Sequence, residues 1–245
     1  MVLAAKYTNQ GGRPVNEDSC DIFSKQNMIC VTVADGLGGH GGGEIASSMA
    51  VEMAGMFFEE QETIEPSDLY TWFQNINEKV YGAQTDVCRM KTTLTLLLAD
   101  VEKGKSFWAH VGDSRIYHFK DGVMSSVTFD HSVSQMAVFA GEITFEQIRH
   151  HEDRSRLLRA IGSHDEVNVE ISEECDISTG NHAFLLCSDG FWEYVYEAEM
   201  EETLRSSENP VQWLEQMSLI IQSRVDGTND NNTAVAVWIM NGDEG

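Results

Sequence analysis

The 245-residue sequence has few of the features that divide a chain or attach it to a membrane. Its three prolines stand far apart, and it contains no low-complexity tract, internal repeat or recognisable linker. We therefore expect a single domain over residues 1–245, long enough to bury a hydrophobic core. No run approaches the roughly 18 apolar residues of a membrane span, and the first residues do not resemble a signal peptide. Neither a membrane span nor a secretory leader is predicted.

Cysteine is also scarce. The five cysteines include no CxxC pair and show no spacing typical of a disulfide framework. Cys30 and Cys187 lie in apolar runs, where we expect them to pack as small hydrophobic residues. An odd number of unpaired cysteines suggests a reducing compartment, so we expect a cytoplasmic protein.

Positive charge is the third scarcity: 16 lysines and arginines face 40 acidic residues, for a formal net charge of −24. Binding to nucleic acid requires clustered cations, so a nucleic-acid partner is not expected. The acidity favours solubility and repels anionic membrane surfaces. Most of the carboxylates are explained as a solvated surface, but several stand beside glycines inside apolar segments.

The hydrophobic pattern predicts strands and helices in groups. Strand-like runs occupy residues 3–8, 20–23, 28–34, 92–100, 106–112, 114–119, 167–171, 182–188 and 233–240. Helical periodicity covers residues 46–57, 69–80 and 211–225, with prolines at the expected starts of the last two. Turn signals such as Lys103-Gly104 fit antiparallel hairpins. The grouping favours an α+β fold of two sheets packed face to face, with helices outside each sheet.

The stretch VADGLGGHGGGE, residues 33–44, combines an aspartate with six glycines after an apolar run. A Walker loop would need a Gly-Lys-Ser/Thr ending, which is missing, and Asp35 would repel a dinucleotide pyrophosphate. A hard divalent cation fits better. Asp35 would project from the end of a strand, and Gly36 would let the backbone bend and offer its carbonyl as a second oxygen ligand.

Acidic residues at the ends of predicted strands recur along the chain. An isolated Asp-Gly is usually a turn, as we expect at Asp121-Gly122 and Asp226-Gly227. Further acidic residues stand at the ends of predicted strands: Glu17, Asp18, Asp113, Asp189 and Asp230. If they met at one end of a sandwich, their repulsion would require cations, and two divalent ions would suggest hydrolysis of a phosphate ester. Arg13 is the candidate for holding the phosphate oxygens.

These segments together resemble a known family. The strings RPVNED, VADGLGGH, TTLTLLL, GDSRIY, DHS, RLLRAIG, LLCSDGFWE and DNNTAV occur in this order over about residues 13–237. Each string alone is weak, but the ordered set resembles the metal-dependent protein phosphatases (PPM, type 2C), in the form found in bacterial serine/threonine phosphatases.

The resemblance implies an αββα sandwich: two central, mostly antiparallel sheets flanked by helix pairs, with a flap (about residues 133–155) beside the cleft. It implies a phosphoric monoester hydrolase that removes phosphate from phosphoserine and phosphothreonine. The nucleophile would be a water bridging two Mn²⁺ or Mg²⁺ ions, without a phosphoenzyme. A choice between the two metals is not possible because oxygen-only sites accept both.

The resemblance also assigns residues. Asp35 would bridge the two ions, the Gly36 carbonyl would bind one of them, and Asp189 and Asp230 would complete the other site. In the early motif Asp18 is favoured as the acidic ligand, with the adjacent Glu17 left open.

Two further roles follow from the same positions. Asp113, together with Asp189, would hold a third and weaker ion, and Arg13 would bind the substrate phosphate. Many eukaryotic members carry a histidine after the Asp-Gly, where this chain has Leu37. The general acid therefore stays open between a metal-bound water and His40. We favour the interpretation of His40 as a packed or solvated residue over a catalytic role.

Two alternatives to an active phosphatase make different predictions about the ligands. A catalytically weak or inactive module that binds phosphoproteins would have lost metal ligands, whereas every mapped position here is acidic. A calcium-binding structural sandwich would group its ligands in one loop, whereas these are spread over about 210 residues. The active phosphatase is favoured. We expect a free-standing monomer acting on substrates of a serine/threonine kinase, with flap residues such as Arg149 and Arg154 either contacting the phosphoprotein or simply solvated.

Overall fold

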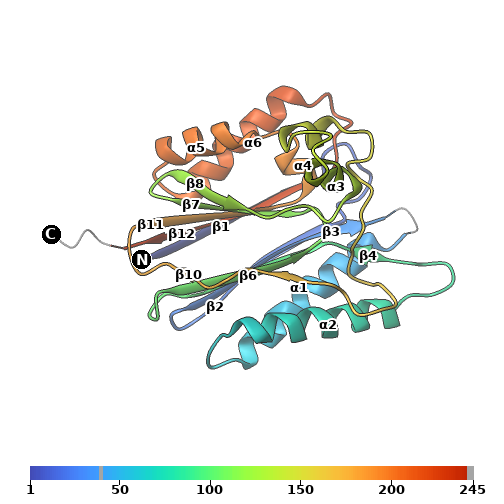
Figure 1. The fold of residues 1–245 in the computed structure, drawn as a ribbon, viewed down its shortest axis with the longest axis horizontal. Coiled ribbons are helices and arrows are strands. Elements are labelled where there is room, and N and C mark those ends of the chain that lie inside the picture. Colours follow the sequence, from blue (N-terminus) through green and yellow to red (C-terminus); the bar gives the residue numbers. More distant parts are fainter. Residues whose placement is uncertain (39–40, 242–245) are drawn as a thin grey trace.

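Figure 1 shows the protein as a computed structural model, which describes residues 1–38 and 41–241. Two β-sheets pack face to face in the middle, and helices cover the outer face of each sheet. The expected α+β sandwich with helix pairs outside is confirmed. None of the helices in these ranges combines the length and apolar character needed to cross a membrane.

The first sheet has the strand order β1-β12-β11-β7-β8, and its neighbouring strands are antiparallel. Its strands are β1 (Val2–Asn9), β7 (Arg115–Lys120), β8 (Val123–Val127), β11 (Asn181–Cys187) and β12 (Asn232–Met240). Both chain-terminal strands, β1 and β12, therefore pair with each other along their full length.

The second sheet has the order β10-β6-β5-β3-β2, with β4 paired to β3 and β9 to β6. Its strands are β2 (Asp18–Lys25), β3 (Met28–Leu37), β4 (Lys91–Thr92), β5 (Leu94–Asp100), β6 (Lys105–Val111), β9 (Glu170–Ile171) and β10 (Cys175–Asp176). The strand expected over 167–171 shortens to β9, because only its last two residues pair with β6.

Four longer helices form the outer layers. Helices α1 (Gly43–Glu60) and α2 (Pro66–Gly82) cover the second sheet, and α5 (Glu197–Ser206) and α6 (Pro210–Arg224) cover the first. The prolines begin α2 and α6 as expected. Helical periodicity in the sequence does not mark α5, since this helix buries only Met200, Thr203 and Leu204. Two shorter helices, α3 (Val133–Phe139) and α4 (Asp189–Trp192), and a 3-10 turn, η1 (Glu146–His150), lie at one end of the sandwich.

Strand β3 is an uninterrupted apolar run because both of its faces are buried. Alternate residues of this strand face different cores: Ile29 and Val31 pack between the two sheets, while Met28 and Cys30 pack beneath α1 and α2. A strand covered on both faces needs no polar alternation. Helix α1 approaches the sheet closely at Gly55, where a Cβ would lie 2.4 Å from the ring of Phe23.

The flap contains α3 and η1 and is anchored by a buried cation. Arg115 at the start of β7 forms a bidentate ion pair with Asp130, with both N–O distances at 2.8 Å. Its guanidinium stacks on Trp192 of α4 and on Phe145 of the flap. Arg149, expected on the flap surface, is buried instead and donates to Glu197 and to the Val195 carbonyl.

Replacing this buried cation should destabilise the fold strongly. We expect Arg115→Met to lower the free energy of unfolding by about 3–5 kcal/mol, because the Asp130 carboxylate would stay buried without its partner. The exposed pair of Arg205 with Glu201 provides the control: Arg205→Met should cost less than about 1 kcal/mol. Urea unfolding of the three proteins measures the difference, and equal losses in both variants would refute the anchoring role.

Candidate metal centre

An open cleft of about 500 Å³ lies at the end of the sandwich where the flap sits. Residues from both sheets and from the flap line it: Arg13, Pro14, Val15, Glu17, Asp35, Gly36, Leu37, Gly38, Asp113, Ser155, Leu157, Asp189, Asp230 and Asn231. Five of these are acidic, and they come from five separate segments of the chain. Most of the strand-end carboxylates that the sequence singled out therefore meet in one place.

Asp35 lies at the floor of the cleft and is fixed through its backbone. Its N–H donates to Thr93 Oγ1 at 2.9 Å, and its carbonyl accepts from the N–H of Thr93 and the hydroxyl of Thr92. The sequence placed Asp35 at the end of its strand, but β3 continues to Leu37. The reason is the short strand β4, which pairs with Gly36 and Leu37 after β5 has diverged.

Gly36 is held where no other residue fits. A Cβ at this position would lie 2.2 Å from the carbonyl oxygen of Gly43, at the start of α1, and 2.6 Å from that of Glu17. The backbone of β3 therefore passes directly beneath α1, with Gly36 at the cleft wall.

Asp18 stands directly opposite Asp35 in the antiparallel pairing of β2 with β3. Its side chain is buried: Ser188 Oγ donates to Oδ2 at 2.8 Å, while Oδ1 has no hydrogen-bond partner among the described residues. Burial, together with the nearby charges of Asp189 and Asp230, raises the pKa of Asp18 to about 7 against the lowering effect of the hydrogen bond from Ser188. Oxygen Oδ1 is thus a buried acceptor that lacks a partner.

The adjacent Glu17, which the early motif left open as the alternative to Asp18, lies at the surface of the cleft. Its carboxylate lines the cleft and lies against Gly38 and Gly43, leaving no room for a side chain at either glycine. Its N–H is fixed by Asn231 Oδ1 at 2.8 Å. Asp18 is buried and is not among the residues that line the cleft. Glu17 is therefore at the surface of the site and Asp18 is in the interior beside it.

Three more acids complete the cluster. Asp189 begins α4 directly after β11, Asp113 follows β6, and Asp230 precedes β12. Burial raises the pKa of Asp189 to about 7, and the nearby charges of Glu193 and Asp230 act in the same direction. Burial, with repulsion from neighbouring aspartates, holds the pKa of Asp35 and that of Asp113 well above the usual range.

Such a cluster is a poor arrangement without a positive partner. The carboxylates raise one another's pKa, and a divalent cation would reverse this by neutralising the charge. All the side-chain donors that face one another here are oxygens, the ligand type that Mn²⁺ and Mg²⁺ prefer. Together with the unpartnered Asp18 Oδ1, this chemistry fits a site for hard divalent ions.

Arg13 stands at the mouth of the cleft. Its guanidinium is more than half exposed and donates through Nη2 to Asp230 Oδ2 at 2.5 Å. The other Asp230 oxygen accepts the N–H of Asn231, so the acid and the arginine hold each other at one edge. Arg13 can therefore reach an anion in the cleft with its remaining N–H groups.

Several supporting residues were not singled out from the sequence. Ser188, Thr93 and Asn231 fix the acids through hydrogen bonds, and Trp192, interpreted only as core or rim packing, donates to the Asp113 carbonyl at 2.9 Å. All four belong to the quoted motif strings or stand within them, so motif membership was the available signal.

The flap reaches the cleft through Ser155, and Leu157 follows just beyond it. Leu37 lines the cleft where eukaryotic relatives were expected to carry histidine. His40, the candidate general acid, lies outside the described residues.

Comparison with known proteins agrees with this geometry. Residues 9–229 match the family described as protein phosphatase 2C. The serine/threonine phosphatase Stp of Listeria innocua is 35% identical over 198 residues, which span 78% of this chain and 78% of that protein.

Solved structures show the same fold. The serine/threonine phosphatase Stp1 from Staphylococcus aureus aligns with a TM-score of 0.87 and 27% identity, over 98% of this chain and 96% of the other. The catalytic domain of the phosphatase PstP, in complex with two manganese ions, aligns with a TM-score of 0.78 and 26% identity, over 96% and 97% of the two chains. The chain therefore belongs to the protein phosphatase 2C family and is a metal-dependent serine/threonine protein phosphatase.

Proposed function

We propose that this phosphatase binds two Mn²⁺ or Mg²⁺ ions in the cleft and hydrolyses phosphoserine and phosphothreonine by direct attack of water. The observation that carries the proposal is the convergence of Asp35, Asp113, Asp189 and Asp230, from four segments, on one cleft. The negative charges of these neighbouring carboxylates are balanced most simply by divalent cations.

The carboxylate of Asp35 would be shared by both ions, with the Gly36 carbonyl on one side and Asp189 and Asp230 on the other. The early motif would supply one more carboxylate ligand. Glu17 lines the cleft and Asp18 has an unpartnered oxygen, so both stay candidates for this ligand. Asp113 with Asp189 would hold a third, weaker ion. When bound, the ions would supply a water of lowered pKa and neutralise charge on the phosphate oxygens.

The protein's own contribution is orientation and charge. Arg13 would bind two phosphate oxygens through its forked N–H groups and turn the ester bond towards the floor of the cleft. The backbone bonds of Asp35 to Thr93, and those of Glu17 to Asn231, would keep the acids in place during the reaction. The group that protonates the leaving alkoxide stays open.

The substrates would be phosphoproteins made by a serine/threonine kinase. The cleft is open to solvent and Arg13 at its mouth is more than half exposed, so an extended phosphorylated segment could lie across it. The inactive, phosphoprotein-binding alternative loses ground because this chain keeps an acidic residue at every mapped carboxylate position. Turnover decides between the two.

Asp35→Asn should abolish most of the activity on a phosphothreonine peptide in Mn²⁺. We expect kcat/KM to fall roughly 10²–10⁴-fold, since the shared ligand contributes several kcal/mol of charge stabilisation. Without metal, the same variant should be at least as stable as the wild type, because one repelling charge is gone. Asp121→Asn, in the exposed β7–β8 turn, is the matched control and should keep full activity.

EDTA should likewise stop the wild-type reaction, and Mn²⁺ should restore it. Undiminished turnover of Asp35→Asn, or of wild type in EDTA, would contradict the two-metal assignment. A folded wild-type protein that binds Mn²⁺ but turns over nothing would favour the phosphoprotein-binding module.

Arg13 should act mainly on substrate binding. Arg13→Ala removes a charged, forked hydrogen-bond donor worth about 1.5–3 kcal/mol, so kcat/KM should fall roughly 10–100-fold. Most of the change should appear in KM, and Arg13→Lys should recover only part of it because an ammonium lacks the fork. Steady-state kinetics on the phosphopeptide test this, with Arg205→Lys as the control. An unchanged KM in Arg13→Ala would argue against phosphate binding.

A further inference from the structure

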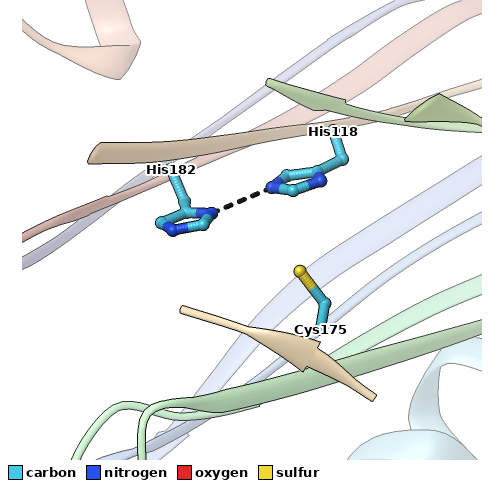
Figure 2. A group of neighbouring side chains, drawn as sticks. All are labelled: His118, Cys175 and His182. Carbon is cyan, nitrogen blue, oxygen red and sulfur yellow. Dashed lines mark hydrogen bonds between the residues drawn. The ribbon is translucent and has the colours of Figure 1, made fainter. Parts of the chain in front are cut away.

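A second group of metal-ligating side chains lies far from the cleft. Figure 2 shows His118 of β7, His182 of β11 and Cys175 of β10 directed towards one another. His182 is near the first residue of β11, whereas Asp189 follows the last, so the two places are roughly 20 Å apart along the strand. The proposed catalytic site does not use these three residues.

The three side chains are close and sheltered. One ring nitrogen of each histidine and the Cys175 sulfur all lie within 4.8 Å of one another. His118 and His182 are 4% and 2% exposed, while Cys175 is half-buried and leaves a path from solvent. The histidines belong to one sheet and the cysteine to the other, so the group bridges the two halves of the sandwich.

The hydrogen bonds of His182 leave a lone pair facing the group. Its Nε2–H donates to the carbonyl of Thr179 at 2.9 Å, which leaves Nδ1 unprotonated in the neutral ring. This Nδ1 lies 2.9 Å from His118 Nε2. A backbone carbonyl that fixes the far nitrogen is the support that metal-binding histidines almost always have.

The charge states also suit a metal. Burial, with smaller effects of His182 and Lys120, lowers the pKa of His118 to about 4, so this ring is neutral at pH 7. Burial raises the pKa of the Cys175 thiol, while Ser106 and Lys120 oppose that effect. Ser106 lies directly opposite Cys175 in the β6–β10 pairing, and its buried hydroxyl has no hydrogen-bond partner in the described part of the chain. It is available to donate to a thiolate.

A second compact group of possible metal ligands is less suitable for a metal ion. His110, His131 and Glu170 are equally close, but Arg159 places its Nη1 3.1 Å from His131 Nε2. A guanidinium already occupies the position in which a cation would bind. In the described part of the chain no arginine hydrogen-bonds to the first group, and the charge of Lys120 acts on His118 and Cys175.

We propose that His118, His182 and Cys175 form a second metal site, selective for Zn²⁺ and distinct from the carboxylate centre. Neutral imidazoles and a thiolate are the ligands that Zn²⁺ prefers, with water as the fourth ligand. Tetrahedral Zn²⁺ separates two nitrogen ligands by roughly 3.3 Å, so the histidines open slightly and the sulfur closes by about 1 Å at most. The proton on His118 Nε2 moves to its Nδ1, and the thiol proton is released to solvent.

The bound ion would join the two sheets at the end opposite the cleft. It would stabilise the folded state because the unfolded chain does not hold the three ligands together. At a hundredfold excess of Zn²⁺ over its dissociation constant, the melting temperature should rise by roughly 5–10 °C. Binding should weaken as the pH falls, since protons compete for the thiolate.

Co²⁺ titration of the metal-stripped full chain tests the site separately from the catalytic centre. A thiolate-to-metal charge-transfer band reports Co²⁺ on a cysteine, and the carboxylate cluster cannot produce it. We expect the band, saturating at one ion per chain, in the wild type, in Asp35→Asn and in Cys88→Ser. It should vanish in Cys175→Ser and weaken in His182→Gln, and the Zn²⁺-induced rise in melting temperature should vanish with it.

Cys88→Ser is the matched control because Cys88 is also half-buried but lies outside the group. Unfolding curves without metal verify that Cys175→Ser folds, and its Mn²⁺-dependent phosphatase activity should equal that of the wild type. Absence of the band in the wild type, or its persistence in Cys175→Ser, would overturn the proposal. Neither result would affect the proposed function.

Discussion

Two carboxylates that face each other across a pair of strands set the main constraint on this molecule. Asp18 and Asp35 are directly opposed in the β2–β3 ladder, where like charges destabilise the pairing. From this pair to the pair of Lys25 with Met28 the two strands keep one register, and Val31 and Val33 of β3 are buried between the sheets. The fold thus holds the two acids together at a local cost, which a divalent cation bound beside them would remove.

The rest of the structure makes that arrangement rigid. A core between the sheets and two cores beneath the helix pairs hold the strands whose ends carry the acids. Arg115, buried between Asp130, Trp192 and Phe145, ties the flap to the same sheet. Because Trp192 also supports the backbone of Asp113, the flap and the cleft share one anchor.

The two ends of the sandwich differ in their chemistry. At the cleft the donors are carboxylates and carbonyls, which suit hard ions such as Mn²⁺. At the opposite end, two nitrogen donors of one sheet lie close to a sulfur donor of the other. This set of donors suits Zn²⁺. Because oxygen ligands favour Mn²⁺ or Mg²⁺ and nitrogen and sulfur ligands favour Zn²⁺, each site would select its own ion.

The sequence by itself determined the family, the two-sheet architecture and the acidic positions that face the cleft, because apolar periodicity and short motifs are local properties. It correctly separated the Asp121-Gly122 turn from Asp35-Gly36 through the flanking runs. It did not find α5, which buries only a narrow face, and it placed the buried Arg149 on the surface.

Only the tertiary structure decided the rest. Asp18 is buried opposite Asp35 and Glu17 lines the cleft, and this difference between two adjacent acids is not visible in a sequence. His118 and His182 are 64 residues apart, and Cys175 belongs to the other sheet. Their meeting depends on how the sheets stack, which is a property of long-range packing that no local pattern records.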